Sequence, residues 1–300
     1  MVKNKINSKV TIIIPTSLGG QKPIDCINSI QKFNYPDQKI KIVLVDNHTS
    51  DKTYQKIKQK FPKIGVIRNT KNQGFVKAVN QAIRKSPADY FFVTNDDIIF
   101  TKDSLQTLID YAQSHPNTGI VGGTQLDFQG HLLAGGRNFN PFTGRQVTIK
   151  AGRPVSCDQV DGCAMLIRGE TIEKIGLFDE AFFPAYGEDL DFCLRAKKAG
   201  WQIIYHPRAI FYHHFAHTTS KLPLSDVYYF GFKNRLRVII KHANILEITY
   251  FFIFHYLLTM PIRILIRKEP ILGPEIKALN WNLKNLKKTL QARRKLYSRN

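Results

Sequence analysis

Short, strongly apolar runs alternate with helical segments along the first hundred residues, and this alternation limits the possible folds most. The runs rich in β-branched and aromatic residues are 10–14, 40–45, 65–68 and 90–94. The segments between them with helical spacing of apolar residues are 23–33, 51–61 and 75–85. Near-continuous apolar strands separated by helices are typical of a sheet covered on both faces. The pattern therefore predicts an α/β fold with a mostly parallel central sheet flanked by helices.

Polar residues follow two of the predicted strands directly. Asp46 follows the second run, and Asn95, Asp96 and Asp97 follow the fourth. In open α/β sheets, ligands bind at the carboxyl ends of the strands. These residues are therefore the first candidates for a binding site.

The middle of the chain has a different composition. Residues 122–153 are rich in Gly, Pro, Asn and polar side chains, which indicates irregular loops or hairpins. A helix is predicted over 188–199, followed by strand-like runs at 202–205 and 209–212.

Positive charge is concentrated at the end of the chain. The formal net charge is +21, and the last eighty residues carry 16 Lys or Arg against four acids, a net of +12. A boundary near Lys221 is therefore expected, between a first domain of residues 1–220 and a basic, helical C-terminal region of residues 221–300. Such a region favours nucleic acid, anionic lipid or phosphate-bearing substrates, and charge alone does not choose among them.

The C-terminal region also contains an apolar run. Residues 227–242 and 281–299 predict basic amphipathic helices, and residues 244–266 between them are strongly apolar. The uncharged core, residues 249–262, is 14 residues long, short of the roughly 20 needed to span a bilayer. The run therefore favours an in-plane interfacial helix over a spanning one, and a helix packed on the protein's own core is an equal alternative.

The N-terminal residues and the cysteines bear on location. Residues 1–9 are polar and lack the apolar core of a secretory signal, and four cysteines are scattered without paired CxxC spacing. Reduced thiols are expected, and a cytoplasmic location, peripheral at the inner face of the cell membrane.

Two acidic clusters indicate metal-assisted group transfer. Asp96 and Asp97 follow a buried strand, and a second cluster, Glu188 to Asp191, opens a predicted helix about ninety positions later. Mg²⁺ or Mn²⁺ prefers carboxylate oxygen and stabilises the charge on a leaving nucleoside diphosphate. We therefore predict Asp97 as a metal ligand, with Asp96 adjacent to it.

Several short motifs occur in the order found in one enzyme family. They are Val10–Thr16, Val43–Asp51, Asn72–Asn80, Asn95–Asp97, Asp161–Cys163, Gly187–Asp191 and His213. In this order they resemble the family 2 glycosyltransferases over residues 10 to about 220, and the basic helix at 229–241 is similar to the rhamnosyltransferase-like branch. The resemblance implies a GT-A fold, a nucleotide-diphosphate sugar donor, a divalent metal and inversion at the anomeric carbon.

The donor site combines this resemblance with the chemistry of the residues. A carboxylate at a strand end suits the N3–H of uracil or thymine, so Asp46 is expected to read the base. Asp51, which precedes a helix, is expected to cap it rather than to contact the ligand. Gly74 either lets the backbone approach the ligand or starts a helix. The predicted donor-binding residues are Pro15, Thr16, Asp46, Asn72, Gly74, Asn95 and Asp96.

Inversion requires a base on the face of the sugar opposite the leaving diphosphate. Asp189 is the predicted base, with Glu188 and Asp191 beside it in the catalytic set. Favourable charge in the first turn of a helix is the ordinary explanation of those two neighbours. A small displacement would exchange the roles of Glu188 and Asp189, and Asp191 is also spaced to orient Arg195 at i+4.

The resemblance implies two further contacts. His213 is the expected third metal or phosphate contact, with His214 in reserve. Gly162 and Cys163 are expected beside the acceptor or donor sugar.

The predicted function is an inverting, metal-dependent glycosyltransferase. The expected donor is dTDP-rhamnose or a UDP-hexose, and the expected acceptor is a cell-envelope glycan or a polyprenyl-linked glycan. An anionic membrane surface is an expected partner, and nucleic acid is not. A nucleic-acid-binding protein is the first alternative, motivated by the basic tail, although the aromatics cluster in the apolar run 250–256 instead of between basic residues. A sugar nucleotidyltransferase is the second, suggested by the glycine-containing segment 18–22.

Overall fold

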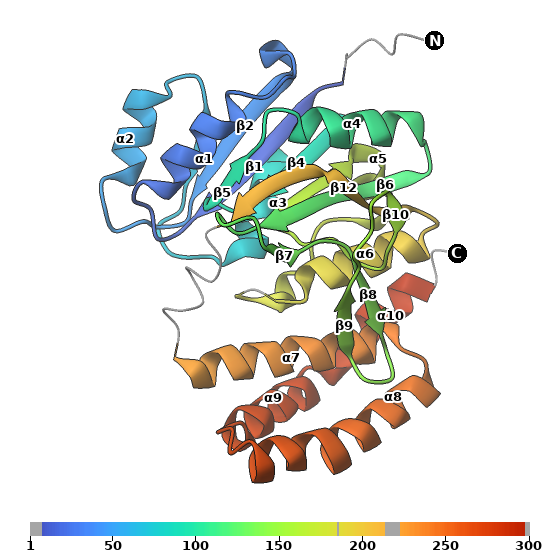
Figure 1. Cartoon of the computed structure of the whole chain (residues 1–300). Helices are drawn as coiled ribbons and strands as arrows, with labels where there is room; N and C mark the ends of the chain where they lie inside the picture. Colours follow the sequence, from blue (N-terminus) through green and yellow to red (C-terminus); the bar gives the residue numbers. More distant parts are fainter. Residues whose placement is uncertain (1–7, 185, 214–222, 298–300) are drawn as a thin grey trace.

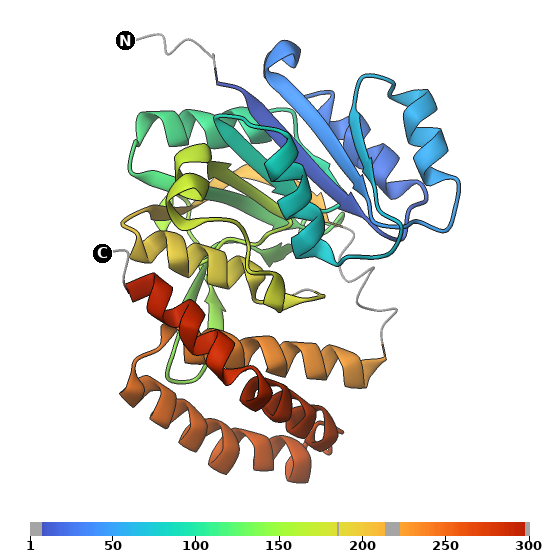
Figure 2. The same ribbon diagram turned by 180° about the vertical axis from the view of Figure 1, so that it is seen from behind.

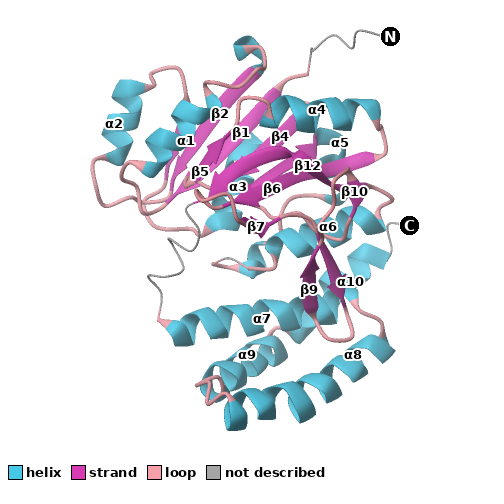
Figure 3. Ribbon diagram, viewed as in Figure 1, coloured by secondary structure: helices cyan, strands magenta, loops and turns pink. Residues whose placement is uncertain are grey.

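A mixed, ten-stranded sheet forms the centre of the computed structural model, which describes residues 8–184, 186–213 and 223–297 (Figure 1). The order along the sheet is β10-β12-β6-β11-β4-β1-β2-β3, with β5 paired to β12 and β7 to β6. Helices cover both faces, and the C-terminal helices form a further layer at one side (Figure 3). The α/β architecture predicted from the alternating runs is confirmed.

The strands of this sheet are β1 (Val10–Thr16), β2 (Ile40–Asp46), β3 (Gly65–Arg68), β4 (Tyr90–Thr94), β5 (Ile98–Phe100), β6 (Thr118–Leu126), β7 (Leu132–Ala134), β10 (Val155–Ser156), β11 (Ala164–Arg168) and β12 (Gln202–His213). A separate hairpin consists of β8 (Arg137–Asn140) and β9 (Arg145–Thr148). The helices around the sheet are α1 (Lys22–Ile30), α2 (Thr53–Lys60), α3 (Phe75–Lys85), α4 (Ser104–Ser114), α5 (Gly169–Ile175) and α6 (Glu188–Lys198).

Alternation of side chains along the buried strands gives the protein two cores. In β1, Ile12 and Ile14 enter the core that includes residues of α1 and α4, whereas Ile13 enters the core that includes residues of α3 and α6. The strands β4, β1, β2 and β3 run parallel, so their carboxyl ends lie at one edge. Figures 1 and 2 show the two helical layers from opposite sides.

The prediction of loops over residues 122–153 is wrong at its start. Gly122 and Gly123 lie within β6, a long buried strand between β11 and β12. A Cβ on Gly123 would lie 2.2 Å from the carbonyl oxygen of Ala209, so β12 approaches too closely for a side chain. The two glycines therefore interrupt the β-branched signal that Ile120 and Val121 give in the same strand. The two strand-like runs after α6 also form one strand, β12, with an irregularity between Tyr205 and Ile210.

The C-terminal region is helical, as predicted. Its helices are α7 (Leu224–His242), α8 (Ile245–Phe252), the π-helical turns η4 (Ile253–Thr259) and η5 (Ile262–Ile266), α9 (Leu272–Lys284) and α10 (Leu286–Tyr297). The predicted helix over 281–299 is thus divided at Asn285 between α9 and α10. The predicted boundary at Lys221 lies outside the described residues.

The apolar run forms one continuous helical segment, longer than its uncharged core. Ile245–Ile266 contains 22 residues, and an 18-residue window within it has a mean hydropathy of 1.5; among the described residues it alone is long and apolar enough to cross a membrane. The expectation that this run is too short to span a bilayer is therefore wrong as far as the length of the helical segment is concerned. All four cysteines are buried and unpaired, as expected for reduced thiols.

Candidate functional site

The parallel strands bring Thr16 and Asp96 together at one edge of the sheet. β1 ends at Thr16 and Asp96 follows β4, and the Thr16 hydroxyl donates a 2.5 Å hydrogen bond to Asp96 Oδ2. Burial raises the pKa of Asp96 to about 6, the hydrogen bond from Thr16 opposes the shift, and the charge of Asp97 adds to it. The two residues predicted at the donor site are thus direct neighbours.

Asp97 lies opposite His213, although 116 positions separate them. β5, which begins directly after Asp97, pairs with the end of β12, and this pairing places His213 across from Ile98. His213 Nε2 lies 3.1 Å from Asp97 Oδ1, and both side chains are nearly buried. The reserve candidate, His214, lies outside the described residues.

Gln125 of β6 determines how His213 is oriented. Its amide nitrogen donates to Asp161 Oδ2 at 3.1 Å and to Cys163 Sγ at 2.8 Å, so its oxygen must accept from His213 Nδ1, 2.6 Å away. A neutral His213 with its proton on Nδ1 presents the Nε2 lone pair to a carboxylate oxygen, which is repulsive unless a proton or a cation lies between them. The pair with Asp97 is thus built for a positive charge.

This pair fits Mg²⁺ or Mn²⁺ as a partial set of ligands. Carboxylate oxygen and imidazole nitrogen both suit Mn²⁺, and sites of this kind use one or two protein ligands together with substrate phosphates. Within residues 8–184, 186–213 and 223–297 there is no group of three or more His, Cys, Asp or Glu that could hold a metal ion. The remaining positions would therefore belong to the donor's diphosphate and to water.

Asp161 connects this pair to the second acidic cluster. Arg137 of β8 donates to Asp161 Oδ2 at 3.0 Å, and the N–H of Gly162 donates to Asp189 Oδ2 at 3.4 Å. Burial raises the pKa of Asp161 to about 6, Arg137 opposes the shift and Asp189 adds to it. A connected line of polar contacts therefore runs from Asp97 through His213, Gln125 and the Asp161–Gly162 turn to Asp189.

Glu188 and Asp189 differ in their surroundings. Gly187, with φ +81°, is the N-cap of α6. Asp189 is half-buried, and its Oδ1 accepts from the N–H of Leu190 at 2.8 Å. Glu188 is 8% exposed, and its Oε2 has no hydrogen-bond partner among the described residues. Burial, followed by the charge of Asp189, raises the pKa of Glu188 well above its usual value. Asp189 is therefore the better placed carboxylate for a base.

The predicted base reader, Asp46, is fully buried at the end of β2. Its Oδ1 accepts from the N–H of Thr49 at 2.8 Å, and its Oδ2 lies 3.2 Å from Arg68 Nε. Oδ2 accepts no hydrogen bond among the described residues and is fully buried beside Arg68, so recognition of a nucleobase by Asp46 would need Arg68 to move. Contrary to the capping expectation, Asp51 is not the N-cap of α2, because that position is Lys52. Asp51 Oδ1 accepts from the N–H of Thr53, the first residue of the helix, and its Oδ2 accepts from the N–H of Gly20.

Asn72 and Gly74 shape the turn before α3. Asn72 Oδ1 accepts from the N–H of Gly74 at 2.8 Å and from Asn47 Nδ2 at 2.8 Å. Gly74 caps α3 with φ +78°, and a Cβ there would lie 2.6 Å from the ring of Phe183. Of the two roles expected for Gly74, the structure shows the start of a helix, and the group that lies close to its backbone is the Phe183 ring.

The remaining predicted residues surround this edge. Pro15 is buried in β1. The N–H of Asn95 donates to the carbonyl of Cys163 at 3.2 Å, which joins the ends of β4 and β11. Cys163 is buried with its sulfur against Gln125, so it faces this network, whereas Gly162 lies beside Asp189.

Comparison with known proteins gives a family. The family described as "Glycosyl transferase family 2" matches residues 11–172, more than half of the chain. The chain belongs to glycosyltransferase family 2. It is therefore a glycosyltransferase, and this decides between the three functional classes that the sequence left open.

Relatives of this glycosyltransferase include two rhamnosyltransferases. The N-acetylglucosaminyl-diphospho-decaprenol L-rhamnosyltransferase of Mycobacterium tuberculosis (strain CDC 1551 / Oshkosh) is 29% identical, and the match covers 64% of this chain and 72% of the relative. The rhamnosyltransferase WbbL of Escherichia coli (strain K12) is 26% identical over 69% of this chain and 85% of the relative. These names belong to the relatives.

A solved structure supports the fold. GalNAc-T7, crystallised with UDP, GalNAc and Mn²⁺, matches with a TM-score of 0.67 and 14% identity over 83% of this chain. The match spans 50% of that solved chain. The likeness confirms the predicted GT-A-like fold, with its mixed sheet and flanking helices.

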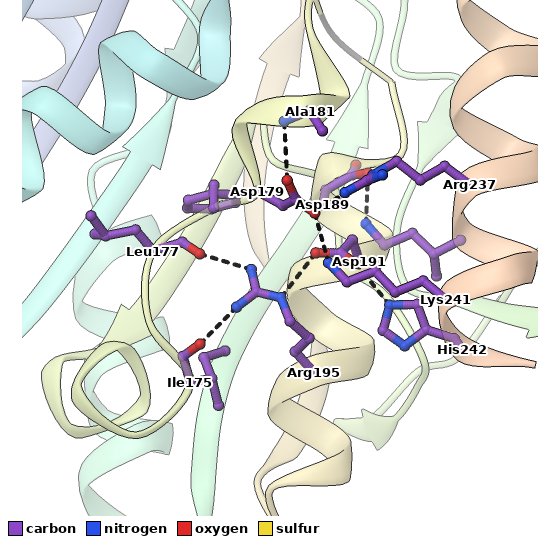
Figure 4. A network of polar contacts seen from close by, with 12 residues as sticks. Ile175, Leu177, Asp179, Ala181, Asp189, Asp191, Arg195, Arg237, Lys241 and His242 are labelled. Atoms are coloured by element: carbon purple, nitrogen blue, oxygen red, sulfur yellow. Dashed lines mark hydrogen bonds and ion pairs between the residues drawn. The ribbon is translucent and has the colours of Figure 1, made fainter. Parts of the chain in front are cut away.

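In this glycosyltransferase, Asp191 belongs to a buried ion-pair network and not to the acidic edge (Figure 4). Its carboxylate is fully buried between Arg195 Nε at 2.9 Å, Lys241 Nζ at 2.7 Å and His242 Nε2 at 2.8 Å. Burial opposes ionisation of Asp191, but Lys241 and Arg195 outweigh it and hold its pKa well below the usual value. The prediction of Asp191 beside the base is thus corrected, and its predicted i+4 contact with Arg195 is confirmed.

Asp179 extends this network. Arg237 and Lys241 of α7 both reach Asp179 Oδ2 at 2.8 Å, and Asp179 Oδ1 accepts from the N–H of Ala181 (Figure 4). Lys241 therefore bridges Asp179, which precedes α6, and Asp191, which lies in the first turn of α6. Helix α7 is thus basic as predicted, but its central cations point inward and hold the helix that carries Asp189.

Proposed function

We propose that this chain is an inverting, metal-dependent glycosyltransferase that transfers a sugar from dTDP-rhamnose or a UDP-hexose to a polyprenyl-linked or cell-envelope glycan. The observation that carries the proposal is the line of polar contacts from Asp97 to Asp189. This line supports the proposal because it connects a pair suited to a cation with a half-buried carboxylate, the two groups that an activated diphosphate and an attacking hydroxyl require.

The names of the relatives support the choice of donor and acceptor. Two of them are rhamnosyltransferases, and the name of the mycobacterial enzyme specifies a decaprenyl-diphosphate-linked acceptor. A sugar acceptor of this lipid-linked class also agrees with a cytoplasmic enzyme held at the inner membrane face.

Asp189 is the proposed base. It accepts the proton of the acceptor hydroxyl while that oxygen attacks the anomeric carbon, and the bond from this carbon to the diphosphate oxygen breaks on the opposite face. The bonding electron pair leaves with the diphosphate, and attack from the opposite face inverts the configuration at the anomeric carbon. The N–H groups of Gly162 and Leu190 orient the Asp189 carboxylate, and burial raises the pKa of Glu188, which disfavours a second negative charge beside it.

Asp97 and His213 are the proposed ligands of Mg²⁺ or Mn²⁺. When bound, this ion stabilises the negative charge of the departing diphosphate. Gln125 holds the His213 ring with Nε2 toward Asp97. Asp96, beside Thr16, is proposed to contact the donor ribose or sugar, and Asp46 to read the base after release from Arg68.

A thermal-shift panel tests the donor and the metal together. UDP-, dTDP- and GDP-sugars are each added with and without Mn²⁺ to the wild type, to Asp97→Ala and to Asp37→Ala, a control at an exposed carboxylate. One donor should raise the melting temperature only with Mn²⁺, in the wild type and the control but not in Asp97→Ala. No stabilisation by any donor, or equal stabilisation of Asp97→Ala, contradicts the proposal.

A further inference from the structure

The helical segment Ile245–Ile266 has an apolar face that the described part of the chain leaves uncovered. Only 11% of its most apolar 18-residue window is buried. The large apolar side chains exposed along it, here called the apolar ridge, are Ile245, Leu246, Tyr250, Ile253, Leu257, Leu258, Ile262, Leu265 and Ile266. Their spacing of mostly three or four residues places them along one side of the segment. Leu257 and Leu265 are 74% and 75% exposed, and an apolar face of this extent marks an interaction surface.

The opposite side of the segment is packed on protein in both halves. Phe251, in the first half, is buried in one cluster with Leu236 of α7. Ile264, in the second half, packs against the cluster that contains Phe232 of α7. The segment therefore lies along the helical layer from end to end and does not project from it (Figure 1).

Polar pairs also tie the inner side to its neighbours. His255 Nε2 lies 2.8 Å from Glu275 Oε1 of α9, and both side chains are buried. Arg263 Nε donates to Glu269 Oε2 at 2.9 Å. Moving the segment across a bilayer would carry these ionisable groups, or leave them unpaired, in hydrocarbon, which costs several kcal/mol per group. The packing therefore favours an orientation in the plane of a membrane.

Positive charge borders the apolar ridge. Arg267 and Lys268 are exposed and follow it directly. The last eighty residues carry 16 Lys or Arg against four acids, and three of these cations, Lys233, Arg237 and Lys241, are buried. Cations beside an apolar helix face attract anionic lipid headgroups while the apolar side chains enter the acyl boundary.

We propose that the apolar ridge binds an anionic bilayer with the segment 245–266 lying in the membrane plane, without spanning it. This deepens the proposed function and rests on it in one respect, since a polyprenyl-linked acceptor must be reached at a lipid surface. The docked ridge would hold the helical layer, and through Lys241 the base-bearing helix α6, at a fixed height above the bilayer.

Flotation of the full chain with vesicles tests the binding. The probe is phosphatidylcholine vesicles with and without phosphatidylglycerol, and the variant is Leu257→Glu combined with Leu265→Glu. The control is Leu132→Glu on β7, a strand paired with β6 in the central sheet, where the leucine is 38% exposed. The double variant should lose at least tenfold in partitioning to anionic vesicles, and the control should match the wild type. Unchanged partitioning of the double variant overturns the proposal.

Probe depth then separates an in-plane helix from a spanning one. Because the four native cysteines are buried, single labels can be placed with Leu246→Cys, Leu257→Cys and Ile266→Cys. Quenching of environment-sensitive labels by quenchers attached to the lipids at known depths should give the same shallow depth at all three positions. A label at position 257 that lies near the bilayer centre, with the two others near the interfaces, overturns the in-plane arrangement.

Two further measurements assign failures to their cause. Light scattering without lipid should give the same mass for wild type and double variant. A wild-type dimer that the two substitutions dissociate, without vesicle binding, would instead identify a second copy as the occupant. Transfer to a lipid-free acceptor analogue should survive the double substitution. Loss of this transfer in the wild type, with vesicle binding intact, counts against the proposed function alone.

Discussion

Lys241 of α7 places its ammonium nitrogen 2.7 Å from a carboxylate oxygen of Asp191 on α6. Both side chains are almost fully buried, with exposures of 3% and 0%. Asp191 lies two residues after Asp189, the proposed base, on the same helix. The C-terminal region therefore supports the helix of the proposed site from inside the protein, in addition to its proposed contact with lipid.

Replacement of Lys241 should lower the stability of the whole protein. Lys241→Met leaves Asp191 and Asp179 with one buried cation fewer, and breaking a buried ion pair from one side typically costs about 3–5 kcal/mol. Urea unfolding measures the change. Lys287→Met, at an exposed lysine of α10, is the matched control and should change the free energy of unfolding by less than about 0.5 kcal/mol. Equal stability of the two variants would show that the network holds nothing in place.

The same network predicts an acid dependence of stability. The pKa of Asp191 is well below its usual value in the folded protein, with an unfolded value of about 3.9. Its contribution to stability is therefore present above about pH 3.9 and is lost as the pH falls through the folded pKa. Asp191→Asn should be less stable at pH 7 and should lose less stability than the wild type on acidification. Urea titrations from pH 7 to pH 2 measure both curves, and parallel curves would refute the assignment.

The sheet could be predicted because each buried strand carries its own signal. The limits of β3, β4 and α3 were predicted correctly from apolar periodicity alone. Strand β6 was not predicted, because close approach of Ala209 requires glycine at position 123 and interrupts the β-branched run of Ile120 and Val121. Local patterns contain no information on such tertiary contacts.

The candidate site shows the same division. Carboxylates at strand ends were predictable, whereas Gln125, Arg137 and Arg68 were not, because their roles depend on partners far along the chain. Asp191 was placed at the site because charge in the first turn of a helix has the same pattern whether it faces solvent or a buried lysine. Lys241 points inward and pairs with Asp191, so Asp191 is buried away from the site. Helical periodicity alone did not reveal the direction of Lys241.

Gln125 should act on metal affinity. Gln125→Leu removes the partner of His213 Nδ1 and leaves the ring free to rotate, and loss of such a contact typically weakens metal binding about 10–100-fold. Mn²⁺ titration of sugar transfer should show this weakening, with the rate largely recovered at saturating metal. Gln38→Leu, at an exposed position, is the control. A lower rate at saturating Mn²⁺ with unchanged metal affinity would contradict this role.

Two glycines with positive φ should respond differently to alanine. Gly74→Ala places a Cβ 2.6 Å from the Phe183 ring, whereas Gly20→Ala, with φ +82°, meets nothing within 4 Å. Backbone strain alone costs roughly 1–2 kcal/mol, so Gly20→Ala should show only this loss and Gly74→Ala a larger one. Thermal unfolding of both variants measures the difference. Identical losses would indicate that Phe183 moves aside freely.

The most direct test of the central claim is the Asp189→Asn substitution, measured for donor binding and for single-turnover transfer. Removal of a general base typically lowers the rate by about 10²–10⁴-fold. The account predicts that Asp189→Asn binds the nucleotide-sugar with Mn²⁺ as the wild type does and transfers the sugar at least a hundredfold more slowly. Transfer at the wild-type rate by this variant would contradict the account, because Asp189 would then not be the base.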